Sequence, residues 1–204
     1  MKTRLMRAPH RGFSMIEVLV ALLIIVLGLL GLAGLQVKMQ QAEFESYQRA
    51  QAVILLQDMV ERINLHRITS SCFSFSNPVS GTPFLGTGTA MAISCSASTA
   101  NDNAQAVAAL TEWNSLLQGA AETKGGAGAG AMVGARGCVN YAPGTEVLDS
   151  TGAAIPGTGI FTVAVSWQGT TDTFAPTVSC GNGLYGTETR RRTVSTTFRH
   201  AYLK

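Results

Sequence analysis

The chain has few charged residues, and most of its excess positive charge lies in one short segment. Charged side chains make up 13% of the 204 residues and hydrophobic ones 46%, whereas globular chains average about 25% charged residues. This composition excludes a disordered tail. The formal charge of +3 depends on four basic residues among the first twelve: Lys2, Arg4, Arg7 and Arg11. Without them, 11 basic residues face 12 acidic ones, so we expect no nucleic-acid partner.

Motifs for catalysis and for metal or phosphate binding are missing as well. The chain has neither the G-x-S-x-G pattern of a hydrolase nucleophile nor an S-x-x-K pattern. The Gly- and Ala-rich stretch 119–137 contains no G-x-G-x-x-G and no G-x-x-x-x-G-K, which excludes the common phosphate-binding loops there. After the first twelve residues only two histidines remain, His66 and His200. We therefore expect no enzyme activity, no cofactor and no metal site.

Charge is also absent from a long apolar stretch near the N-terminus. From Val18 to Val37 the one polar side chain is that of Gln36. Twenty helical residues, at about 1.5 Å each, match a hydrocarbon core of about 30 Å, and we expect a membrane-spanning helix over about residues 16–37. Because four basic residues precede it and only Lys38 closely follows, the N-terminus should face the cytoplasm and the remainder should be exported.

The order of features differs from that of an ordinary secretory signal. A small residue, Gly12, precedes the apolar stretch instead of following it. Cleavage after Gly12 would leave the apolar helix in the mature chain. A carboxylate, Glu17, lies just inside the apolar segment, where a charge is costly and favours a partner. The alternative is that Glu17 reaches out to the lipid headgroups.

The segment around Gly12 resembles the class III signal of type IV prepilins and pseudopilins. The similarity covers about 25 residues, centred on Gly12-Phe13-Ser14-Met15-Ile16-Glu17-Val18-Leu19-Val20-Ala21-Leu22. It implies a leader at 1–12, cleavage between Gly12 and Phe13 by a prepilin peptidase, and N-methylation of Phe13. It also implies that Glu17 docks on the new amino group of a neighbouring Phe13, with major and other minor pilins as partners. The proline that family members often carry midway through this helix is absent.

The helical pattern continues beyond the apolar stretch. Residues 40–67 contain no Gly and no Pro, and apolar residues recur at helical spacing: Leu56, Met59, Val60 and Ile63. We expect one helix over 13–67, apolar in its first half and amphipathic in its second. The strings 47–52 and 57–64 resemble the PilV family of type IV pilus modification proteins, which are minor pilins.

Residues 68–204 are expected to form one exported head. Asn101 or Asp102 can cap a helix that runs to about Gln118, and 119–137 reads as a loop. Alternation predicts two half-buried strands with these inward residues: Phe161, Val163, Val165 and Trp167, then Val194, Thr196, Phe198, His200 and Tyr202. The predicted fold is therefore α+β, type IV pilin-like, with the long N-terminal helix packed on an antiparallel sheet. Its helix face is expected to comprise Ala106, Ala109, Leu110, Trp113, Leu116 and Leu117.

All four cysteines lie on the exported side: Cys72, Cys95, Cys138 and Cys180. In an oxidising compartment an even number indicates two disulfides, and no C-x-x-C pair favours zinc. Three pairings are possible. We expect Cys72 with Cys95 and Cys138 with Cys180, because sequential pairing closes the shorter loops.

Three functions from different classes follow from these features. The first is a minor subunit that initiates or caps a type IV pilus, anchored in the bacterial inner membrane before it enters the filament. Strings at 165–169 and 180–186 again resemble the PilV family and favour this reading. The second is a minor pseudopilin of a type II secretion system. The third is a membrane-anchored binding protein or hydrolase whose leader resembles a prepilin signal by coincidence.

Overall fold

The computed structural model describes residues 12–89, 91–121, 123–125, 127–128 and 132–200. The expected leader up to residue 11 and Tyr202 of the expected last strand lie outside this range. The chain divides into two compact units, Met1–Glu43 and Phe44–Lys204. The unit that carries the head therefore begins inside the long helix.

The long helix α1 spans Met15–Leu65. It begins two residues later than the expected range 13–67, because the Ser14 side chain accepts a hydrogen bond from the backbone N–H of Glu17 at 3.3 Å and caps the first turn. It ends two residues earlier, where a tighter 3-10 helix, η1 (Arg67–Phe73), takes over. Within α1 the buried residues follow one face and lie in its second half: Gln48, Ala52, Leu56, Met59 and Ile63.

A four-stranded antiparallel sheet forms the centre of the head. Its strands are β1 (Leu85–Gly86), β4 (Arg136–Ala142), β5 (Ile160–Gln168) and β6 (Arg191–Arg199), in that spatial order. A separate two-stranded sheet consists of β2 (Thr123–Lys124) and β3 (Ala127–Gly128). Two short 3-10 helices, η2 (Pro143–Thr145) and η3 (Glu188–Arg190), lie in the connections.

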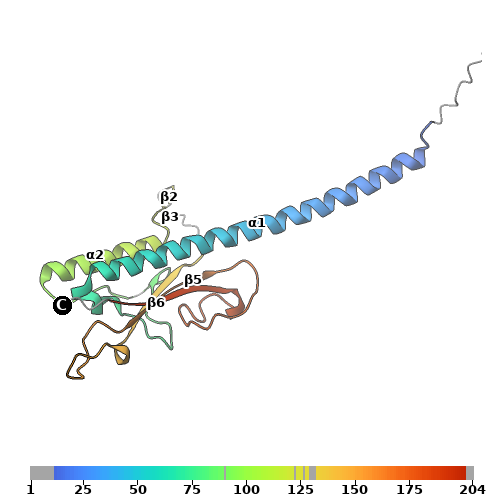
Figure 1. Ribbon diagram of the computed structural model, residues 1–204. Helices are drawn as coiled ribbons and strands as arrows, with labels where there is room; N and C mark the ends of the chain where they lie inside the picture. Colours follow the sequence, from blue (N-terminus) through green and yellow to red (C-terminus); the bar gives the residue numbers. More distant parts are fainter. Residues whose placement is uncertain (1–11, 90, 122, 126, 129–131, 201–204) are drawn as a thin grey trace, which may run out of the picture. The chain divides into compact units, whose positions relative to one another are not determined.

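The second helix, α2, spans Ala100–Leu117 and corrects the expected cap. Its N-cap is Thr99, not Asn101 or Asp102, because the Thr99 hydroxyl accepts a hydrogen bond from the Asp102 backbone N–H. Of the six apolar positions predicted for its inner face, Leu116 is only partly buried and the other five are buried. Figure 1 shows α2 running beside the second half of α1.

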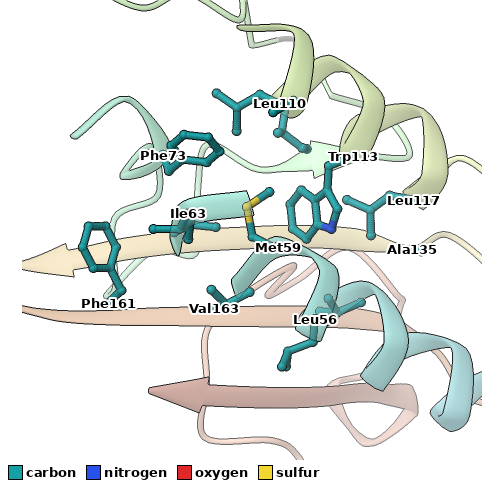
Figure 2. Packing of buried hydrophobic residues seen from close by; sticks show 14 of the residues in the cluster. Leu56, Met59, Ile63, Phe73, Leu110, Trp113, Leu117, Ala135, Phe161 and Val163 are labelled. Carbon is teal, nitrogen blue, oxygen red and sulfur yellow. The ribbon is translucent and has the colours of Figure 1, made fainter. Parts of the chain in front are cut away.

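The two helices and the sheet enclose one apolar core (Figure 2). Trp113 of α2 is completely buried, and its indole N–H donates a 2.9 Å hydrogen bond to the carbonyl of Leu55 in α1. This bond satisfies the polar atom of a large apolar ring and ties the two helices together. The core includes Leu56, Met59, Ile63, Phe73, Leu110, Trp113, Leu117, Ala135, Phe161 and Val163.

Strand β5 differs from the half-buried strand that alternation predicts. Phe161, Val163, Val165 and Trp167 are buried as expected, but Ala164 and Ser166 on the opposite face are buried too. The chain after β5 covers that face: Cys180 packs on Ala164, and the Tyr185 hydroxyl lies 3.1 Å from the Ser166 hydroxyl. Small residues at 164 and 166 mimic the polar face of an exposed strand, so the alternation alone is misleading here.

Candidate modification and assembly site

The candidate processing site lies at the start of α1. Gly12 has open space around its Cα, and Phe13 is 84% exposed. Glu17 stands in the first helical turn, where the partial positive charge of the helix N-terminus favours a carboxylate. The structure therefore presents Gly12, Phe13 and Glu17 within six consecutive residues, all of them exposed to partners.

Ser14 is the functional residue that the sequence analysis missed at this site. Its hydroxyl accepts from the Glu17 backbone N–H, and its carbonyl accepts from the same N–H at 3.1 Å and from Val18 at 3.4 Å. Serine followed three positions later by glutamate is the signature of a capping box. That signal is present in the sequence, and it means that Glu17 also has a local role in starting the helix.

The first half of α1 exposes apolar side chains on every side. It is the one helix among the described residues that is long and apolar enough to cross a membrane, and none of its apolar window is buried inside the protein. Side chains around its whole circumference are about half exposed or more, including Leu19, Leu23, Leu27 and Leu30. A helix that is apolar all round requires lipid or other helices as its surroundings. This half is therefore suited to anchoring in the inner membrane.

The four cysteines form two disulfides in the head. Cys72 of η1 joins Cys95, with Cα atoms 5.3 Å apart, and Cys138 of β4 joins Cys180, with Cα atoms 5.8 Å apart. This is the sequential pairing that the sequence analysis chose. The described residues contain no free cysteine.

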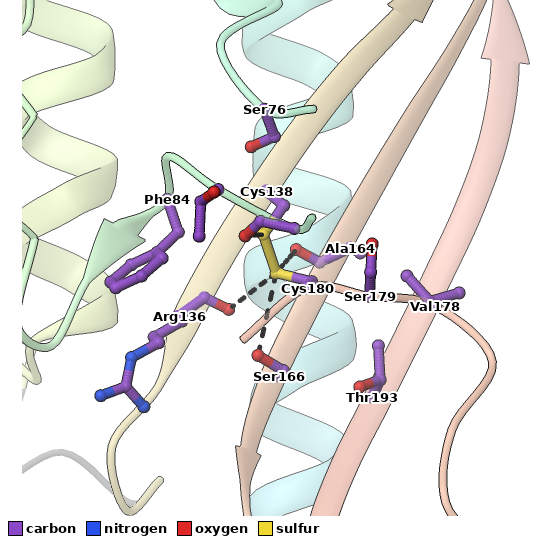
Figure 3. Close-up of a disulfide and its surroundings, with 12 residues drawn as sticks. Ser76, Phe84, Arg136, Cys138, Ala164, Ser166, Val178, Ser179, Cys180 and Thr193 are labelled. Carbon is purple, nitrogen blue, oxygen red and sulfur yellow. Dashed lines mark hydrogen bonds between the residues drawn. A yellow bond between two sulfur atoms is a disulfide. The ribbon is translucent and has the colours of Figure 1, made fainter. Parts of the chain in front are cut away.

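The Cys138–Cys180 disulfide lies under a cluster of polar and aromatic groups (Figure 3). The Arg136 guanidinium lies 4.8 Å from the centre of the Tyr185 ring and 5.2 Å from that of Phe84. Burial raises the pKa of the Tyr185 hydroxyl, which stays protonated and lies 2.9 Å from the Gly134 carbonyl. These contacts fasten the segment after β5 to the sheet.

A second fastening joins that segment to α1. One oxygen of Glu45, Oε1, accepts hydrogen bonds from the Thr170 N–H at 3.0 Å and the Thr170 hydroxyl at 2.7 Å. It also accepts from Thr171 and lies 3.3 Å from an Arg192 nitrogen. Burial alone would raise the pKa of Glu45, but the hydrogen bonds from Thr170, the charge of Arg192 and the hydroxyl of Thr171 outweigh it and lower that pKa.

The two histidines sit in aromatic packing. The His66 ring lies 5.6 Å from Phe73 and its Nδ1 is 2.8 Å from the Arg62 carbonyl. The His200 ring packs against Phe161 and Phe198 at 5.3 and 5.8 Å. In the described part of the chain no group of three or more His, Cys, Asp or Glu side chains is arranged to hold a metal ion.

Comparison with known protein families agrees with this geometry. The prokaryotic N-terminal methylation motif matches residues 7–33. The chain carries a type IV prepilin-like motif. The motif covers Gly12, Phe13, Glu17 and most of the apolar half of α1, and it indicates a pilin or pseudopilin, a structural subunit rather than an enzyme. No curated protein and no solved structure matches the chain.

The fold fits the same class. A long apolar N-terminal helix is followed by a four-stranded antiparallel sheet, which confirms the predicted type IV pilin-like α+β fold.

Proposed function

We propose that this chain is a minor pilin of the PilV kind, a non-catalytic subunit that helps to start a type IV pilus or lies near its tip. The observation that carries the proposal is the methylation motif at 7–33, which runs directly into an apolar helix with no apolar partner inside the protein. An enzyme would not need such a surface. A filament subunit needs it twice, first in the membrane and then in the filament core.

Maturation would begin at the Gly12–Phe13 peptide bond. A prepilin peptidase would hydrolyse this bond, release residues 1–12 and leave a free amino group on Phe13, which is then methylated. The open space around Gly12 supports access by the peptidase. The new N-terminus would lie two residues before the first residue of α1, so cleavage leaves the whole helix in the mature protein.

Docking would then pair unlike charges in an apolar setting. The Glu17 carboxylate has no ion pair with the described residues, and the cleaved chain carries an amine on Phe13. In a bundle of apolar helices each of these charges is costly by itself. Pairing the Glu17 of one subunit with the Phe13 amine of its neighbour would reduce that cost and set the axial register. The competing role is contact of Glu17 with lipid headgroups.

The topology of the proposed subunit is a single pass, with the N-terminus cytoplasmic and the head periplasmic. Two disulfides in the head are consistent with an oxidising compartment. The PilV-like strings 47–52, 57–64, 165–169 and 180–186 favour a minor pilin over the alternative, a minor pseudopilin of a type II secretion system.

The docking step is tested by Glu17→Ala, with Glu43→Ala as the matched control on the same helix. Both residues are exposed, and the control lies outside the apolar stretch. We expect Glu17→Ala to be inserted and cleaved but strongly depleted from sheared pili, and Glu43→Ala to be incorporated normally. Normal incorporation of Glu17→Ala would favour the headgroup role instead.

Deletion of the gene separates the two filament types. We expect fewer surface pili, or altered adhesion and retraction-dependent behaviour, while the major subunit is still made. Intact piliation together with failure to export a folded enzyme across the outer membrane would favour the secretion pseudopilin.

A further inference from the structure

An extended segment before α2 has the form of a strand without a partner. Along residues 91–96 the exposure alternates: Met91, Ile93 and Cys95 are partly buried against the core, and Ala92, Ser94 and Ser96 are exposed. Period-two alternation is the pattern of a strand with one face on a core. Yet this segment belongs to neither sheet of the described chain.

The backbone of this segment is unpaired. Among the described residues, no hydrogen bond satisfies the N–H or C=O groups of residues 92–96. Its two ends are nevertheless held in place: the Met91 N–H donates to the Thr89 hydroxyl, and the Ala97 N–H donates to the Asn103 side-chain oxygen at 3.0 Å. The disulfide from Cys95 to Cys72 holds the middle. The segment is a fixed row of free donors and acceptors.

A cavity of about 420 Å³ lies along the segment. Its walls include Ser71, Ser74 and Phe75 on one side and residues 91–97 on the other. Hydroxyls of Ser94 and Ser96 also line it. The cavity gives room beside the free backbone groups and holds no charged side chain.

Charge does not protect this edge against pairing. From Ile68 to Asn101, 34 consecutive positions contain no Asp, Glu, Lys or Arg. Natural proteins commonly place charges or Pro on open strand edges to prevent association. The outer strand β6 follows that rule, with Arg191 and Arg192 at one end and Arg199 at the other. The segment 91–96 has neither device.

We propose that residues 92–96 pair antiparallel with the same segment of a second copy of this chain, with Ser94 opposite Ser94. The pairing is self-complementary, because no register brings like charges together and the exposed side chains, Ala92, Ser94 and Ser96, are small. Two β6 edges paired in the same way would set Arg192 opposite Arg199, which is unfavourable. The interaction surface is therefore a short two-fold strand pair, separate from the apolar helix and additional to the filament role.

The test uses the full chain in detergent at a series of concentrations, with hydrogen exchange measured on peptides that cover 91–97. We expect exchange there to slow as concentration rises, and both Ser94→Lys and Ser94→Glu to weaken this dimer about fivefold by like-charge repulsion. An equimolar mixture of the two variants should restore pairing. Ser150→Lys, at an exposed turn of the head, is the matched control and should behave like the wild type.

The mixture makes the outcomes decisive. A misfolded variant would not regain protection when mixed with its charge-reversed counterpart, so restored slow exchange supports the strand pair. Exchange at 91–97 that is independent of concentration would overturn the proposal. So would a dimer that is unaffected by either Ser94 variant, since pairing would then occur elsewhere, as through the apolar half of α1.

Discussion

The two units of the chain use apolar residues in opposite ways. In residues 15–43 of α1 the apolar side chains surround the helix and none is buried in the protein. In the unit from Phe44 onward they gather on one face of α1, one face of α2 and the sheet, and they form a closed core. The comparison indicates that the head depends on its own packing, whereas the apolar half of α1 depends on surroundings that other molecules supply.

Removal of the Cys138–Cys180 disulfide should have the largest effect on the head. The double variant Cys138→Ser/Cys180→Ser frees a loop of 42 residues, and we expect the free energy of unfolding to fall by about 4 kcal/mol. Urea unfolding of the detergent-solubilised chain, followed by fluorescence of the buried Trp113 and Trp167, measures it. Membrane insertion should be unchanged, and an insertion defect would contradict the independence of the two units.

A charge in the apolar half of α1 should produce the converse result. For Ile25→Lys we expect a cost of about 3 kcal/mol for membrane insertion, because an ammonium lies near the centre of the bilayer. The unfolding curve of the head should stay as in the wild type. Alkaline extraction of membranes measures insertion, with Ile25→Leu as the control, and equal retention of both variants would argue against a membrane span.

A methyl group on Gly137 should disturb the contact of α2 with the sheet. A Cβ there would lie 2.0 Å from Cη2 of Trp113 and 2.8 Å from Cδ1 of Leu117, too close for either ring or side chain to remain in place. We expect Gly137→Ala to destabilise the head by about 1–3 kcal/mol. Gly144→Ala, where a Cβ meets nothing within 4 Å, is the control. Equal unfolding midpoints would show that the core is less tightly packed than described.

The smallest expected effect comes from Glu45 and depends on pH. Because its pKa is lower in the folded head than in the unfolded chain, its carboxylate stabilises the head fully above the ordinary glutamate pKa, and this contribution disappears as pH falls through the lower folded value. Glu45→Gln should cost about 0.5–1 kcal/mol at neutral pH and nothing in strong acid. Urea unfolding at several pH values, with Glu43→Gln as control, measures the difference, and a gap that does not depend on pH would exclude the carboxylate as its cause.

Local patterns predicted the elements whose cause is local. The apolar stretch from Val18 and the alternation in β5 and β6 mark their elements because each residue's environment depends on its own element. The leader junction and Glu17 were recognisable because they are part of a contiguous motif. The capping box at Ser14 was equally local and could have been read.

Features created by distant contacts could not be predicted in this way. Strand β4 starts at Arg136, at the end of a stretch rich in Gly and Ala, and no alternation of large residues marks its start. Burial of Ser166 depends on Tyr185, 19 residues later. The contacts between Glu45 and Thr170 join positions 125 residues apart, and neither position has a sequence signature of its own.

The central claim, that this chain is a processed filament subunit, is tested most directly by mass spectrometry of its N-terminus in sheared pili. The chain should be present at a low ratio to the major subunit and should begin at a methylated Phe13. Gly12 replaced by a bulky residue should block processing and remove the chain from the pili while leaving it in the membrane. A chain that keeps Met1 or Lys2 and is absent from sheared pili would contradict the account.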